Sequence, residues 1–460
     1  MSDRRVLFAC DLDSQVFGAL PLALAFEARG WRPTFAIDAG RGLTTSAAER
    51  LGGRFEIIER SLGALALDEA ALGSDAVGVY ATGSRVLLFR HVCELAARAL
   101  ERPRPALFCG FNGLVLGRFE EGVAWRLGYD QICLNGPRDR DAFAAFLATT
   151  DFSGQPAVIT GLRRRPDSPL RGLKPPPEPG RRKVFVFAEQ VAVPGDPRRR
   201  GELVAALARL AAASPDWDVV VKARVRPQEQ TFHDQTHHVE HLVAKLAVRP
   251  ANLLVSYAPI DGLLAAADLF GTISSTALFD ALDHGVPAVL AADFGVRNAH
   301  GTHLMLGSGV SVRLGELASL DDAPRRRPNP RWLDRVGYGP AHSAGALIDR
   351  LEAFDPTAPL PPALYGFDEA ARGAAPSGRY SAPISAAREA AEAALAAGDK
   401  AGARAALGKL GQALERSDRQ RAMDEAWRTR EGKGARYARR LGLYGTYKAL
   451  RTRLLGEFPS

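Results

Sequence analysis

The sequence predicts an α/β protein of two doubly wound domains facing a cleft, with a C-terminal helical extension. Short β-rich runs alternate with longer helical patterns, and one Pro- and Arg-rich stretch interrupts that alternation. The length of 460 residues also exceeds what one hydrophobic core usually organises. We expect a first domain at 1–162, a linker at 163–183, a second domain at 184–355 and an extension at 356–460.

The first domain begins with an apolar strand at 5–10 and a helical pattern at 17–30. Further strands are expected at 34–37, 55–58, 106–111, 131–134 and 157–160, and helices at 86–100 and 119–127. This alternation predicts a parallel sheet with helices on both faces.

The alternation restarts after the linker, which has no apolar periodicity. Strands are expected at 184–187, 219–221, 253–257, 269–273 and 288–290, and helices at 202–213, 260–267 and 276–284. Two such sheets joined by one linker leave a cleft between the carboxyl ends of their strands, where sheets of this kind bind ligands.

The extension contains an Ala-rich pattern at 386–414 that predicts a helical hairpin turning near Gly398 and Asp399. Residues 428–460 hold nine Lys or Arg and two Glu, and so carry most of the net charge of +8. Apolar residues recur in this tail at helical spacing, which predicts either an amphipathic helix on an anionic membrane surface or a helix packed on the protein. The body is nearly neutral, and we expect no nucleic-acid partner.

Composition excludes several other classes of protein. No apolar run is long enough to span a membrane, and Asp11 and Asp13 precede any secretory segment. We therefore expect a cytoplasmic protein, with the tail as a candidate peripheral contact at the inner face of the plasma membrane. The four cysteines have no metal-ligand spacing and predict neither disulfides nor zinc.

The most informative stretch runs from the strand at 269–273 to Pro287. Ser274, Ser275 and Thr276 follow that strand at the expected start of a helix, where hydroxyls and free N–H groups bind phosphate. The alternative is an ordinary helix cap. Gly285-Val-Pro287 follows one helix length later and leads into another strand, which favours the anion site.

Three cations stand at alternate positions from the end of the strand at 219–221. Lys222, Arg224 and Arg226 share one side there, as a ligand phosphate requires. The alternative is a solvated loop, since Lys and Arg are usually exposed.

These motifs resemble the donor-binding unit of GT-B glycosyltransferases, especially capsule-type enzymes that use CMP-activated acidic sugars such as sialic acid and Kdo. More specifically, the chain resembles an uncharacterised family of bacterial GT-B glycosyltransferases. Over 5–315 it shares with that family, besides the Ser-Ser-Thr unit, Asp11-Leu-Asp-Ser14, Lys222-Ala-Arg-Val-Arg-Pro227, Gln235-Thr-His-His238, Asp293-Phe-Gly-Val296, Gly301-Thr-His-Leu304 and Gly307-Ser-Gly309. One departure is Lys222-Ala-Arg224, where CMP-sugar enzymes usually carry Lys-x-His-Pro.

The resemblance implies two Rossmann-like domains and transfer of a sugar from a nucleotide donor to a glycan or glycolipid acceptor, without a cofactor. An inverting transfer needs a general base, for which Asp13 and Asp11 are our first choices. Either Asp13 or Ser14 alternatively caps the helix that follows.

Histidines complete the expected site. A group at helical spacing invites a metal hypothesis but has no accompanying ligand motif, so we expect no metal. Its members are His233, His237, His238 and His241. We expect His238, and His303 with its neighbour His300, to contact the nucleotide sugar. The alternatives to a transferase are a nucleotide-sugar 2-epimerase of the same fold and a non-catalytic GT-B-like assembly protein.

Overall fold

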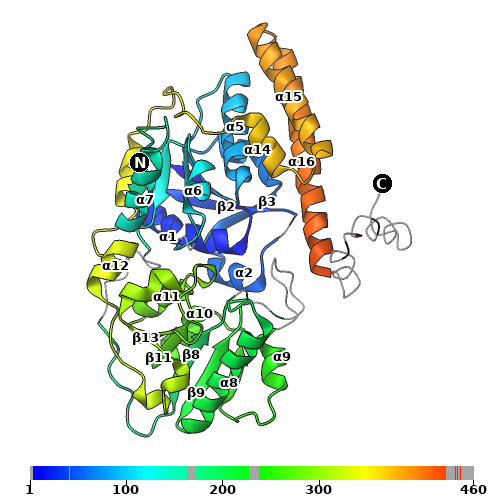
Figure 1. Cartoon of the computed structure of the whole chain (residues 1–460). Helices are drawn as coiled ribbons and strands as arrows, with labels where there is room; N and C mark the ends of the chain where they lie inside the picture. The colour runs from blue at the N-terminus through cyan, green and yellow to red at the C-terminus, as the bar shows by residue number, and fades with distance from the viewer. Residues whose placement is uncertain are drawn as a thin grey trace.

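The computed structural model of the chain describes residues 4–40, 42–114, 117–162, 172–191, 193–224, 226, 238–430, 441, 443 and 446. Two parallel sheets, of seven and six strands, form two lobes that meet near the middle of the molecule (Figure 1). None of the helices in the described ranges is long and apolar enough to cross a membrane.

The first sheet has the order β3-β2-β1-β4-β5-β6-β7. Its strands are β1 (Arg5–Cys10), β2 (Arg32–Asp38), β3 (Glu56–Arg60), β4 (Ala76–Tyr80), β5 (Ala106–Cys109), β6 (Gln131–Leu134) and β7 (Ala157–Ile159). β4 was not predicted, although it pairs directly with β1, from Val6 opposite Ala76 to Cys10 opposite Tyr80. The order reverses between β1 and β4, and such a reversal marks the ligand-binding edge of a doubly wound sheet.

Helices cover both faces of the first sheet. They are α1 (Asp13–Ala28), α2 (Thr45–Leu51), α3 (Leu62–Leu65), α4 (Glu69–Leu72), α5 (Ser84–Ala99), α6 (Phe119–Ala124) and α7 (Pro137–Leu147). One face carries an aromatic core in which Phe8 stacks on Phe35 and meets Phe26 and Phe108 edge-on. The other face packs against α5, whose inward residues are fully buried.

The second sheet has the order β10-β9-β8-β11-β12-β13. Its strands are β8 (Lys183–Ala188), β9 (Trp217–Lys222), β10 (Leu253–Ser256), β11 (Leu269–Thr272), β12 (Ala288–Ala291) and β13 (Ser311–Val312). Its helices are α8 (Pro197–Ala213), α9 (Val239–Ala244), α10 (Ile260–Ala266), α11 (Ala277–Asp283) and the 3₁₀ turns η1 (Asn298–His300), η2 (Thr302–Ser308), η3 (Leu314–Glu316) and η4 (Leu320–Asp322). The prediction of a second parallel α/β unit is confirmed.

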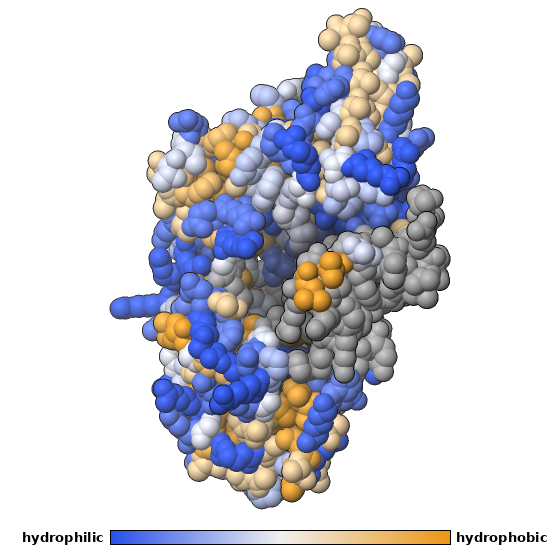
Figure 2. Space-filling model, turned by 45° about the vertical axis from the view of Figure 1, so that its right-hand side comes forward, coloured by the Kyte–Doolittle hydropathy of each residue, from blue (hydrophilic) through white to orange (hydrophobic). Residues whose placement is uncertain are grey.

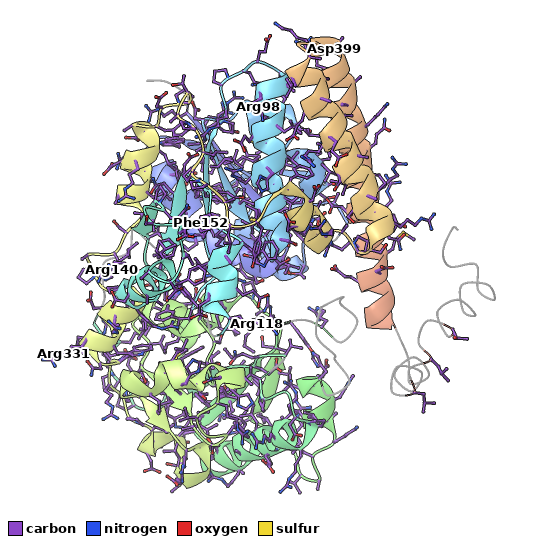
Figure 3. All side chains as sticks on the ribbon, turned by 45° about the horizontal axis from the view of Figure 1, so that its top comes forward. Arg98, Arg118, Arg140, Phe152, Arg331 and Asp399 are labelled. Atoms are coloured by element: carbon purple, nitrogen blue, oxygen red, sulfur yellow. The ribbon has the colours of Figure 1, made fainter. Side chains whose placement is uncertain are left out.

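The chain returns to the first lobe earlier than the expected division at 355. α12 (Pro330–Val336) contacts α7, and α13 (Gly345–Glu352) buries Leu347 and Ile348 in the aromatic core of the first sheet. Figure 3 shows Arg140 of α7 and Arg331 of α12 on the same side of the molecule. Trp332 and Leu333 keep α12 in the core of the second lobe. Gly337, which follows α12, approaches the first lobe so closely that a Cβ on Gly136 would lie 2.4 Å from its backbone N.

The extension packs on the opposite side of the first lobe. It consists of α14 (Phe367–Ala374), α15 (Gly378–Ala396) and α16 (Lys400–Arg430), and the turn between the last two confirms the predicted hairpin. Leu407, Leu410 and Leu414 lie in the same core as α5. The hairpin rises beyond the lobe, with Asp399 at its tip (Figure 3), and blue hydrophilic and pale orange surface alternate along it (Figure 2). From 431 onward the expected basic tail lies almost wholly outside the described residues.

Candidate active site

A cleft of about 580 Å³ lies between the two sheets, at the carboxyl ends of β8, β9 and β11. Its second-lobe side is lined by Glu189, Gln190, Lys222, Arg224, Ser274, Ser275 and Thr276. Its first-lobe side is lined by Ser14, Phe17, Glu49, Arg50, Asn112 and Leu114. The structure thus brings five of the eight predicted ligand-binding residues into one cavity between the lobes.

Two of these residues supply positive charge. Lys222 ends β9 and is buried, with Nζ donating to the carbonyl of Ala223 at 2.7 Å. Arg224 is exposed within the cleft. Desolvation by the surrounding protein lowers the pKa of Arg224, while the nearby carboxylates of Asp13 and Glu189 act in the opposite direction. A guanidinium and an ammonium at one strand end form an electrostatic site for phosphate.

Asp13 of the first lobe directly precedes Ser14, which lines the cleft. It lies in the first turn of α1, half-buried, and Oδ1 accepts a hydrogen bond from the backbone N–H of Thr44 at 3.3 Å. Leu12 occupies the N-cap position and no side chain caps the helix, so the alternative capping role of Asp13 or Ser14 is wrong. Asp13 itself is not among the residues that line the cleft, whereas its neighbour Ser14 is, and the negative charge of Asp13 acts to raise the pKa of Arg224.

Asp11 lies elsewhere. Its side chain is fully buried, and Oδ2 accepts hydrogen bonds from Thr82 N, Thr82 Oγ1 and Arg85 Nη1 at 2.9, 2.7 and 3.2 Å. A carboxylate held by a buried guanidinium below the sheet edge has no route to an acceptor hydroxyl. The structure therefore leaves Asp13 as the candidate base of the pair.

The serine and threonine hydroxyls divide into a structural and an accessible set. Ser274 is buried. Its hydroxyl donates to the carbonyl of His300, and its backbone N–H donates to Gln190 Oε1 at 3.0 Å. Ser275 and Thr276 line the cleft ahead of α11. Ser275 Oγ accepts from Ala277 N at 3.2 Å and keeps its proton available to a ligand.

Arg226 and His238 do not line the cleft. Arg226 is exposed, with its guanidinium 4.7 Å from the Tyr257 ring centroid. His238 is the N-cap of α9, where Nδ1 accepts from Glu240 N at 3.2 Å, and its ring stacks on Tyr257. Both belong to a side cluster around Tyr257.

His300 and His303 sit in the glycine-containing loop beside Ser274 and, like Arg226 and His238, are not among the residues that line the cleft. Nδ1 of each ring is buried and has no hydrogen-bond partner in the described part of the chain. Burial lowers the pKa of His300, and the nearby charges of Arg297 and Arg199 lower it further. A buried imidazole nitrogen beside two cations suits a hydrogen-bonding anionic group.

The first-lobe residues of the cleft were missed by sequence reasoning. Arg50 of α2 crosses to the second lobe, donating to Asp280 Oδ1 at 2.6 Å, and its guanidinium lies 5.4 Å from the Phe17 ring centroid. Glu49 of the first lobe and Asp261 of the second lobe also line the cleft. No local pattern marks them, because the partners are more than 200 residues apart.

No cluster of His, Cys, Asp and Glu in the described ranges can hold a metal. His233 and His237 lie outside those ranges, so the histidine group at helical spacing stays untested as a whole.

The molecule has two parallel doubly wound sheets that face a cleft, and α13, which follows the second lobe, crosses back to the first sheet. This arrangement is the GT-B architecture. The chain belongs to the family described as "Putative glycosyltransferase (DUF6716)", which matches residues 6–354. The extension from 355 lies beyond the matched range. A comparison with curated proteins gives no match.

Solved structures of similar shape include CalG4, the calicheamicin glycosyltransferase, at 19% identity and a TM-score of 0.41, covering 76% of this chain and 99% of that one. The S. aureus MnaA-UDP co-structure is 13% identical, with a TM-score of 0.48 and coverage of 76% and 96%. SnogD from Streptomyces nogalater is 18% identical, with a TM-score of 0.39 and coverage of 76% and 100%.

Proposed function

We propose that the chain is a metal-independent glycosyltransferase that takes a CMP-activated acidic sugar, of the sialic acid or Kdo type, and transfers it to a bacterial surface glycan or glycolipid. The observation that carries the proposal is the cleft between the two lobes, where Lys222, Arg224, Ser275 and Thr276 lie together at the carboxyl ends of the second sheet. Family membership supports the reaction class.

In this mechanism the acceptor oxygen attacks the anomeric carbon while the bond from that carbon to the phosphate oxygen breaks. Asp13 takes the proton from the acceptor hydroxyl. The leaving phosphate keeps the electron pair, and Lys222 and Arg224 neutralise its charge, as a divalent cation does in other folds. Ser275 and Thr276 donate hydrogen bonds to the same phosphate.

The acidic sugar is proposed from the loop that follows β12. The positive charges of Arg297 and Arg199 lower the pKa of His300, and Nδ1 of His300 has no hydrogen-bond partner in the described part of the chain. We propose that this loop, beside Ser274, meets the sugar carboxylate. A sugar carboxylate at this loop would accept from the imidazole and meet the cations at once. The acceptor would enter from the first lobe, and residues 428–460 remain the candidate contact with the inner membrane face.

The first test is calorimetry of the purified protein with CMP, CDP, UDP, GDP and ADP. We expect CMP to bind selectively, and Lys222→Ala and Ser275→Ala to weaken it. Lys245→Ala, an exposed cation beyond the cleft, is the matched control and should bind normally. Unchanged affinity in both cleft variants would remove the proposed site.

Turnover is then measured as CMP release from CMP-sialic acid and CMP-Kdo, with and without EDTA. Equal rates in EDTA would support metal independence. Selective binding of UDP or GDP would support a glycosyltransferase but contradict the CMP-activated acidic sugar as its donor. If no nucleotide binds, the proposal of an enzyme is overturned in favour of a non-catalytic assembly protein.

A further inference from the structure

The C-terminal extension is built into the first lobe although the family match ends before it. Ala403, Leu410 and Leu414 of α16 are buried in the same core as β1, β4 and α5. This helix therefore has a fixed position relative to the carboxyl edge of the first sheet, where Asp13 lies.

α16 also supplies a charge to that edge. Asp418 Oδ1 accepts from Arg85 Nη2 at 3.2 Å, and Oδ2 accepts from Ser61 Oγ at 2.7 Å and Gly63 N at 2.8 Å. The same guanidinium binds Asp11 and Asp38. Burial lowers the pKa of Arg85, but the carboxylates of Asp418, Asp38 and Asp11 outweigh it and hold the pKa above its usual value. One permanent cation thus ties α16 to the ends of β1 and β2.

The loop after β2 connects this ion cluster to the cleft. Asp38 begins the loop, and a Cβ on Gly40 would lie 2.6 Å from Cβ of Ala422, so α16 touches the loop backbone directly. At the far end, Thr44 donates its N–H to Asp13 and caps α2 through Oγ1. α2 then carries Arg50 into the cleft.

We propose that α16 is a positioning element of the active site, with Asp418 as its positioning residue. Asp418 holds Arg85 and the loop after β2, so that Thr44 orients the Asp13 carboxylate. Arg50 keeps its own partners in the second lobe, Asp280 and Asp261. The expected loss of turnover rests on the proposed function, whereas the expected loosening of the loop after β2 does not. The residues proposed to bind the phosphate come from the second lobe, and the described contacts of Asp418 are all with the first lobe.

The test compares Asp418→Asn with Glu389→Gln in the full-length protein. Glu389 is an exposed carboxylate on α15 that pairs with its neighbour Arg388, so this control removes the same charge from the same hairpin without touching the loop. In Asp418→Asn, Arg85 keeps Asp11 and Asp38 as partners. Turnover is expressed per nucleotide-binding site counted by calorimetry, so an unfolded fraction does not mimic a slower enzyme.

For Asp418→Asn we expect kcat to fall by about ten- to a hundredfold, because small misplacements of a reacting group have effects of that size. KM for the nucleotide sugar should stay within about twofold, and amide hydrogen exchange in residues 42–51 should accelerate. Glu389→Gln should change none of these. A kcat within about twofold of the unmodified protein, or a loss confined to KM, would overturn the proposal.

The exchange measurement separates the two proposals. If the unmodified protein turns over no nucleotide sugar, the proposed function fails, and exchange in 42–51 alone decides the role of α16. Unchanged exchange in Asp418→Asn would overturn the positioning role whatever the activity.

Discussion

Gly337→Ala tests how tightly the two lobes are joined. Gly337 follows α12 with φ of 98°, and a Cβ there would lie 1.8 Å from the carbonyl oxygen of Asn135 in the first lobe. Asn135 has little freedom to move, because its side chain donates to Gly113 O at 3.0 Å and to Asp139 Oδ2 at 2.7 Å. The substitution must therefore strain the backbone and push the lobes apart.

The expected cost has two parts. A left-handed conformation costs an alanine about 1–2 kcal/mol, and overpacking against a rigid neighbour adds about 1–3 kcal/mol. Gly309→Ala is the matched control, because its φ is 73° and no atom lies within 4 Å of the added Cβ. Gly309→Ala should lower the free energy of unfolding only by the conformational cost of about 1–2 kcal/mol.

The assay is urea unfolding of the variants and the unmodified protein, followed by circular dichroism. We expect Gly337→Ala to lower the free energy of unfolding by about 2–5 kcal/mol, the sum of the two parts. If the two glycine variants lose the same free energy, the contact between the lobes is looser than the structure indicates and the reasoning is refuted.

Three further predictions concern the base, acid stability and a buried ion pair. Asp13→Asn should lower kcat by about 10²–10⁴-fold with little change in nucleotide affinity, since a general base acts on the acceptor; an unaltered kcat would exclude Asp13. Burial, and then the charge of Arg90, lower the pKa of His91 to about 4, below its ordinary value of 6.5. Between about pH 4 and 6.5 the unfolded chain therefore binds a proton at His91 that the folded chain does not. The contribution of neutral His91 to the free energy of unfolding is present above about pH 6.5 and is lost as the pH falls toward 4. His91→Asn should flatten the thermal-unfolding profile over that window, and an equally steep profile would contradict the assignment. Arg104→Ala removes the bidentate partner of Asp130, at 2.6 and 2.8 Å, and should cost about 3–5 kcal/mol in urea unfolding; a loss below about 1 kcal/mol, typical of an exposed pair, would show the pair to be solvated.

The strands and the place of the Ser-Ser-Thr run between a strand and a helix were predictable because their signals are local. β1 and β8 are continuous apolar runs, and Ser274 to Thr276 stand between a strand and a helix whose lengths can be read from the sequence. β4 was missed, since its central Gly78 and short length weaken the pattern.

Roles set by distant partners could not be predicted. Asp11 looks like a catalytic base at the end of β1, but its role follows from Arg85, 74 residues later. His238 matched a ligand-binding pattern and instead caps α9. The positions of Arg50 and α13 likewise depend on contacts that form only when the two lobes and the returning chain have come together.

α13 returns to one face of the first sheet, and α16 packs in the core on its other face. These two late additions determine the order in which the molecule is completed during translation. The second lobe is encoded without interruption between β8 and Gly337, so it has all of its sheet soon after that stretch leaves the ribosome. The first lobe is synthesised earlier but must wait for Leu347 and Leu414 before its apolar faces are covered. Until then those faces are available to chaperones and to mispairing. The lobe that begins first is thus finished last, and a ribosome that stops after residue 354 releases every residue of the cleft in a chain that lacks Leu410 and Leu414 of the first lobe's core.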